Sequence, residues 1–312
     1  MKRLALAALV GLSACRYPAL TDAELAARTS PAPSRGACLE TVTAFPATHA
    51  SAVRRAPIVV TSPSLLAPRV LHRGREGGLV AYLSFQGHAV YVVGFDAPSC
   101  DEALASRAFA NVVREVSQRT REPVVHVVGT SLGAPIAVRA VGLLADEGGS
   151  PVGRVALVGP GLDYAYPRSF LARERAHLGG PAGYLCATVE SCRRLSHEPE
   201  VLRAHLAKLP PEAPSLFTPT AERYPGLSGR HEPVLFVVGK ADGVAPSESS
   251  FPVFLAWGSA TPGAARSQKR YFLAARENAL GDDYDHAELF AGASSEDEIF
   301  APVAEFVEGE TD

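Results

Sequence analysis

The sequence has little net charge, since its 312 residues include 30 Lys and Arg against 33 Asp and Glu, a formal charge of −3. It lacks a stripe of basic residues interleaved with aromatic ones, so we do not expect it to bind nucleic acid. It also lacks an internal repeat, which argues against a solenoid or a propeller. What remains is an ordinary globular composition, 47% hydrophobic and 20% charged. Its length suits one large α/β domain or two small ones.

Cysteine is scarce, and none of the five residues forms a CxxC pair or a Cys/His cluster with zinc spacing. Cys15 closes an N-terminal targeting segment, which leaves Cys38, Cys100, Cys186 and Cys192. Four cysteines allow three pairings, and export from the cytoplasm permits disulfides. We expect Cys186 to pair with Cys192, because only five residues separate them, and Cys38 then to pair with Cys100. Four free buried thiols are the alternative.

The N-terminus has no apolar run long enough to span a membrane. Lys2 and Arg3 precede a shorter apolar run, Leu4 to Leu12, and the tetrapeptide LSAC follows, a pattern typical of a signal peptide. LSAC resembles a bacterial lipobox, which implies that residues 1–14 are removed and that Cys15 is lipidated. We therefore expect a lipid-anchored protein of the bacterial cell envelope, facing the periplasm or the exterior. An ordinary secretory signal is the alternative.

Residues 15–37 are rich in Ala, Pro, Ser and Arg without sustained periodicity, and we expect a flexible tether. The folded domain is then residues 38–312, with an early strand at Leu39 to Phe45. From Pro57 onward, short apolar runs alternate with amphipathic segments, as in buried parallel strands joined by crossover helices. This alternation predicts an α/β fold with a doubly wound, mostly parallel sheet. The predicted strands are Ile58 to Thr61, Ala89 to Phe95, Val124 to Val128, Arg154 to Val158, Val234 to Val238 and Arg270 to Ala274.

Two capping-box patterns mark expected helix starts. Ser99 with Glu102 precedes one helical pattern, and Ser295 with Glu298 precedes a final helix that Pro302 must kink or delay.

Residues 164–231 break the alternation, since about 68 residues separate two predicted strands. A segment of that length inside a compact domain needs structure of its own, and its helical patterns predict a cap. The cap is expected over the carboxyl ends of the strands, where ligands bind in open α/β sheets. Its aromatic residues predict an apolar pocket that favours medium-chain over acetyl esters. A helical excursion away from the site is the alternative.

The pentapeptide Gly129-Thr130-Ser131-Leu132-Gly133 directly follows one predicted strand and precedes a helical pattern. In this context GxSxG indicates a sharp turn that presents the central Ser hydroxyl as a nucleophile. The N–H of Leu132, at the start of the helix, is expected to donate to an oxyanion beside Ser131. A tight turn that happens to carry Ser is the alternative.

A Ser nucleophile needs a base within hydrogen-bond reach and an acid that orients this base. Of the nine His residues, only His286 follows a late strand on a loop, so it is the predicted base. Asp242 follows the preceding strand on a loop bounded by Gly and Pro, and it is the predicted acid. Asp163 is the rival acid, because it also follows the carboxyl end of a strand.

The segments GTSLG, GKADGVAP and DYDHAELFAG follow one another in an order that resembles the Ser, acid, His order of α/β-hydrolase serine hydrolases, from roughly Cys38 to the C-terminus. The run PIVVTSPSLLAP, followed by GLVAYLSFQGHAVYVVGFD, is similar to the branch of lipases, esterases and polyhydroxyalkanoate synthases. This resemblance implies that the N–H of Ser64 is the second oxyanion donor. The sequence departs from the lipases, which have HG where it has Thr61-Ser62, and from the synthases, which use Cys at the position of Ser131.

A Ser nucleophile outside the cytoplasm, away from acyl-CoA, favours hydrolysis over polymer synthesis. The sequence thus predicts a serine hydrolase of carboxylic esters that forms an acyl-enzyme on a small-molecule or lipid-like ester and needs no metal or cofactor. An acyltransferase with the same residues is one alternative, and an inactive binding module of the envelope is another.

Overall fold

In the computed structural model, the described residues are 21–31, 39–48, 55–61, 71, 78–95, 102–163, 220–260 and 268–309. No helix in these ranges is long and apolar enough to cross a membrane. Several predictions lie outside the described residues: the signal peptide, Ser64, Ser99, all five cysteines and residues 164–219 of the expected cap.

The domain is built on one eight-stranded sheet with the strand order β1-β2-β4-β3-β5-β6-β7-β8. Strands β1, β2 and β4 pair antiparallel, and every pairing from β4 to β8 is parallel. The predicted mostly parallel sheet is thus confirmed. The strands are β1 (Thr29–Pro31), β2 (Leu39–Phe45), β3 (Ile58–Thr61), β4 (Val90–Phe95), β5 (Val125–Thr130), β6 (Val152–Val158), β7 (Val234–Gly239) and β8 (Lys269–Ala274).

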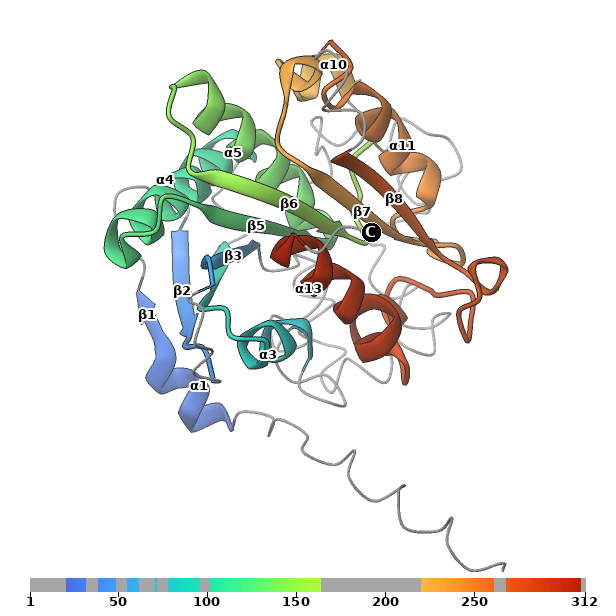
Figure 1. The fold of residues 1–312 in the computed structure, drawn as a ribbon, viewed down its shortest axis with the longest axis horizontal. Coiled ribbons are helices and arrows are strands. Elements are labelled where there is room, and N and C mark those ends of the chain that lie inside the picture. The colour runs from blue at the N-terminus through green and yellow to red at the C-terminus, as the bar shows by residue number, and fades with distance from the viewer. Residues whose placement is uncertain are drawn as a thin grey trace, which may run out of the picture.

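Helices cover both faces of the sheet, and α3 and α13 lie together on one of them (Figure 1). The longer helices are α3 (Gly78–Phe85), α4 (Glu102–Thr120), α5 (Ala134–Asp146), α11 (Ser247–Ala256) and α13 (Ala301–Glu308). The shorter ones are α1 (Asp22–Arg28), α10 (Thr220–Arg223), α12 (Glu288–Ala291), the 3₁₀ turns Ser131–Gly133, Leu227–Gly229 and Arg276–Asn278, and a π-helical turn, η6 (Glu296–Phe300).

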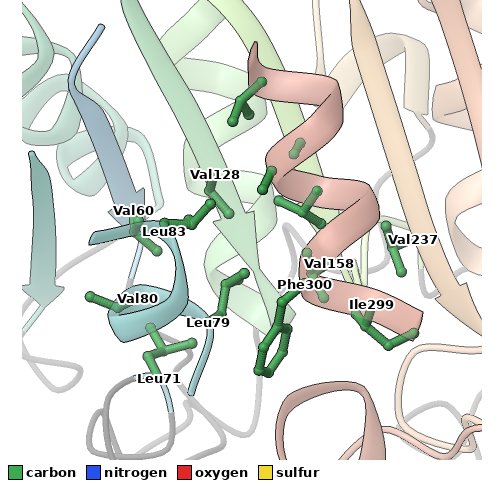
Figure 2. Close-up of a cluster of buried hydrophobic side chains, with 14 of the residues drawn as sticks. Val60, Leu71, Leu79, Val80, Leu83, Val128, Val158, Val237, Ile299 and Phe300 are labelled. Carbon is green, nitrogen blue, oxygen red and sulfur yellow. The ribbon is translucent and has the colours of Figure 1, made fainter. Parts of the chain in front are cut away.

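Successive strand residues pack into two separate cores, because side chains alternate between the faces of a sheet. Val60 and Val128 belong to the core that faces α3 and α13, whereas Val59 and Val127 belong to the core that faces α4, α5 and α11. Figure 2 shows the first of these cores, where strand residues meet α3 and the C-terminal segment. A sheet buried on both faces explains why these strands are almost continuously apolar.

The middle of the expected tether, residues 22–31, has regular structure, which corrects the prediction for these residues. Helix α1 begins at Asp22, and β1 pairs with β2. The helix start is a capping box: the Thr21 hydroxyl accepts from the N–H of Glu24 at 3.3 Å, and the Glu24 carboxylate accepts from the N–H of Thr21 at 2.8 Å. The TxxE pattern at Thr21 and Glu24 is the sequence signal for this helix start.

The prediction that the Ser295 side chain caps the N-terminus of the final helix is also wrong. The Ser295 hydroxyl donates to the carbonyl of Glu288 and makes no side-chain cap. The chain first forms the π-helical turn η6, and α13 begins after it, with Pro302 in its first turn. Pro302 therefore delays the α-helix, as expected, since proline fits the first turn, where its missing N–H needs no partner.

His126 is a buried histidine on β5 that gives the fold a pH dependence. Its Nδ1 accepts from the N–H of Arg154 at 3.2 Å. Burial, together with the charges of His88 and Arg154, lowers the pKa of His126 from 6.5 to about 4. Between about pH 6.5 and pH 4, His126 is therefore protonated in the unfolded chain but largely unprotonated in the folded protein.

We expect the free energy of unfolding to fall by about 2 kcal/mol between pH 7 and pH 5 through this residue, with the loss continuing to about pH 4. Urea unfolding at several pH values measures this slope. The Asn side chain in His126→Asn can still accept from the N–H of Arg154 but does not titrate. In this variant, the fall in the free energy of unfolding between pH 7 and pH 5 should therefore be smaller by about 2 kcal/mol. An unchanged slope in the variant would assign the pH dependence elsewhere.

Candidate active site

The turn between β5 and α5 holds Ser131 in a backbone conformation that is uncommon for a residue with a side chain. Its φ is +50°, in the left-handed region. Gly129 allows the tight passage: a Cβ there would lie 2.7 Å from the Leu157 side chain and 3.0 Å from the Cα of Ala134. The residue between them, Thr130, is fixed to β3, because its hydroxyl donates to the carbonyl of Thr61 at 2.5 Å. The turn therefore passes close to β6 and α5 at Gly129 and is hydrogen-bonded to β3 at Thr130.

Ser131, His286 and Asp242 form a continuous hydrogen-bonded chain. The Oγ of Ser131 lies 2.8 Å from Nε2 of His286, and Nδ1 of His286 lies 2.7 Å from Oδ2 of Asp242. A carboxylate can only accept, so Nδ1 carries the proton and Nε2 is free to accept from the Ser131 hydroxyl. The three residues are 0%, 4% and 3% exposed, respectively, so the contacts are shielded from water.

The loop after β7 fixes the orientation of the Asp242 carboxylate. Its Oδ1 accepts from the backbone N–H groups of Val244 and Ala245, at 2.9 Å and 2.7 Å. Oδ2 is thereby turned toward His286. The same loop meets the His286 loop directly, since the N–H of Ala241 donates to the carbonyl of Tyr284 at 3.0 Å.

Asp163, the rival acid, has a different partner. It follows β6 as expected, but its Oδ2 accepts from the Thr220 hydroxyl at 2.8 Å, and its N–H donates to the carbonyl of Ser249. The structure therefore brings Asp242, not Asp163, to Nδ1 of His286.

Two further residues shape the space around the His286 ring, and sequence reasoning missed both. Phe290 of α12 packs edge-on against the imidazole, with ring centroids 5.8 Å apart. Gly159, directly after β6, also lies against the imidazole of His286. A Cβ at Gly159 would be 3.2 Å from Cε1 and 3.3 Å from Nδ1 of this ring. Its φ is +54°, and a Gly just past a predicted strand was the available signal.

Gly159→Ala should lower kcat/KM on a hydrolysed ester by on the order of 10-fold to 100-fold, because the added methyl displaces the imidazole. Steady-state kinetics on folded variant protein would measure this loss. Gly149→Ala is the matched control, since Gly149 also has a positive φ, +70°, but open space around its Cβ position. The control should lose only stability, about 1 kcal/mol. Equal activities in both variants would mean that Gly159 does not position His286.

The predicted oxyanion donors are only partly placed. Leu132 directly follows Ser131 in the 3₁₀ turn that leads into α5, where backbone N–H groups have no partner of their own within the helix. Ser64 lies outside the described residues. Among the residues that the structure describes, no group of three or more His, Cys, Asp or Glu could hold a metal ion.

No protein-family model matches the chain, and no curated protein sequence matches it. Solved structures do match. A soluble variant of monoglyceride lipase from Saccharomyces cerevisiae, in complex with a substrate analog, has a TM-score of 0.58 at 11% identity and covers 91% of this chain and 100% of its own. The monoacylglycerol lipase of Paleococcus ferrophilus has a TM-score of 0.52 at 16% identity, with 88% and 99% coverage. A bromoperoxidase from Bacillus anthracis has a TM-score of 0.54 at 15% identity, with 86% and 96% coverage.

These similarities, together with the strand order and the turn at Ser131, show that the chain has the α/β-hydrolase fold. At such low identity they show the fold alone. Because a lipase and a bromoperoxidase share it, the reaction has to be argued from the site itself.

Proposed function

We propose that the protein is a serine hydrolase of carboxylic esters. The observation that supports this most strongly is the unbroken chain from Ser131 through His286 to Asp242, at 2.8 Å and 2.7 Å. These distances match a nucleophile, a general base and an orienting acid. The buried setting strengthens each of these hydrogen bonds relative to water.

In the first half of the proposed reaction, the Oγ of Ser131 attacks the ester carbonyl carbon while Nε2 of His286 takes the hydroxyl proton. The carbonyl oxygen becomes an oxyanion, which the N–H groups of Leu132 and Ser64 stabilise. As the intermediate collapses, the carbon–oxygen bond to the alcohol breaks, and His286 returns its proton to the departing oxygen. The products are the free alcohol and an acyl group on Ser131.

In the second half, water attacks the acyl carbonyl while His286 again takes a proton. Collapse of the second intermediate breaks the bond to Ser131 and releases the carboxylic acid, and His286 returns the proton to Oγ. Asp242 keeps the imidazole in the required tautomer and stabilises its protonated form in both halves.

We further propose a lipid-like ester as substrate and an envelope location through lipid on Cys15. The monoglyceride and monoacylglycerol lipases among the structural neighbours favour the first. The lipobox-like LSAC segment supports the second.

The test is hydrolysis of p-nitrophenyl esters from acetyl to palmitoyl by purified protein, with Ser131→Ala as control. We expect hydrolysis by the wild type only, with kcat/KM rising from acetyl toward medium chains, since each buried methylene contributes about 0.8 kcal/mol. No hydrolysis of any ester would contradict the proposed function. A steady loss of rate with each added carbon would contradict the lipid-like substrate alone.

A further inference from the structure

A carboxylate outside the proposed triad is tied to the loop that carries His286. Glu298 lies in the C-terminal segment, in the turn η6. Its Oε2 accepts from the Tyr284 hydroxyl at 2.5 Å, and its two oxygens accept from the N–H of Gly281 at 3.0 Å and 3.1 Å. One side chain thus binds the His286 loop at two points, on its backbone and on a side chain.

Tyr284 connects Glu298 to the candidate active site, because it lies two residues before His286 in the same loop. Its carbonyl accepts from the N–H of Ala241 in the Asp242 loop, and its N–H donates to Ala274 at the end of β8. Its ring is buried. Burial, reinforced by the hydrogen bond to Glu298, raises the pKa of the Tyr284 hydroxyl, so this group stays protonated and donates at every working pH.

The backbone around Glu298 has an unusual form. The turn η6 is π-helical, a rare conformation that occurs frequently at functional sites. The two residues after Glu298, Ile299 and Phe300, are buried in the core that also contains the apolar residues of α3 (Figure 2). Glu298 itself is half-buried and faces the loop instead. The turn therefore fixes Glu298 to the rigid core on one side and to the His286 loop on the other.

We propose that Glu298 is a positioning residue, which acts through Tyr284 and Gly281 to hold the His286 loop where Nε2 reaches the Ser131 hydroxyl. A separate local turn surrounds His286, where the Asp285 carboxylate accepts from the N–H groups of Ala287 and Glu288 at the start of α12. Glu298 instead contacts the part of the loop that precedes this turn, at Gly281 and Tyr284. This inference rests on the proposed function, since it concerns the base of that reaction.

The experiment compares Glu298→Ala, which removes both acceptors, with Glu298→Gln, which keeps one acceptor oxygen, and with Tyr284→Phe, which removes only the hydroxyl. The control is Glu305→Ala, an exposed carboxylate on α13. For each variant we would measure the melting temperature, kcat and KM on p-nitrophenyl butyrate, and the rate of Ser131 labelling by a fluorophosphonate.

We expect Glu298→Ala to lower kcat and the labelling rate in parallel, by on the order of 10-fold to 100-fold, with KM within about twofold of the wild type. Glu298→Gln should recover part of this loss, Tyr284→Phe should show a smaller loss, and the control should match the wild type. A Glu298→Ala protein that melts earlier but keeps its kcat and labelling rate would reduce Glu298 to a structural role and overturn the inference. Absence of labelling in the wild type would instead overturn the proposed function, so the two failures are distinguishable.

Discussion

We expect His286→Ala to lower kcat for ester hydrolysis by on the order of 10³-fold or more, because the Ser131 hydroxyl would lose the proposed base that takes its proton. The loss should fall on kcat rather than KM, since the imidazole contributes to the transition state and not to binding of the ester. Steady-state kinetics on the folded variant measure it.

His231→Ala is the matched control. His231 is an exposed histidine in the loop before β7, and its replacement should leave kcat unchanged. A His286→Ala enzyme that keeps more than about a tenth of the wild-type kcat would be incompatible with His286 as the base.

Asp242→Asn should lower kcat about as much as His286→Ala does, on the order of 10³-fold to 10⁴-fold. The reason lies in the surrounding donors. Val244 and Ala245 direct two N–H groups at the Oδ1 position, so the amide oxygen of Asn must occupy it. The amide NH₂ then faces Nδ1 of His286, which has to accept. This forces the proton onto Nε2, where it blocks transfer from Ser131.

Asp163→Asn provides the comparison, since an amide oxygen can still accept from the Thr220 hydroxyl. We expect kcat within about threefold of the wild type, because the carboxylate charge of Asp163 has no part in the proposed chain. If Asp163→Asn lost far more activity than Asp242→Asn, the acid of the proposed triad would be misassigned.

The central sheet could be predicted from the sequence because its strands β3, β5 and β7 are buried throughout and are therefore short, almost continuously apolar runs. The predicted run Val234 to Val238 corresponds to β7 within one residue. The positions of Ser131, Asp242 and His286 followed from the same pattern, since each lies in the segment that follows a strand and the carboxyl ends of these strands meet at one edge of the sheet.

Other features depend on contacts between residues far apart in the chain, which local patterns do not carry. Gly159 could not be singled out from the sequence, because only the folded structure places the His286 ring against it. Glu298 looked like the last residue of a capping box, whereas its carboxylate meets Tyr284 and Gly281 across a loop. The helix and strand at residues 22–31 do not stand out in the sequence, because a short Ala-rich segment gives little periodicity and β1 is stabilised by its pairing with β2.

The most direct test of a serine hydrolase centred on Ser131 is covalent labelling by a fluorophosphonate, followed by peptide mapping. The account predicts one phosphonylated residue, Ser131, with labelling abolished in Ser131→Ala and slowed in His286→Ala. The strained turn places Ser131 Oγ 2.8 Å from its base, so this hydroxyl should be the activated one. Labelling of another residue, or labelling that persists unchanged in Ser131→Ala, would contradict it.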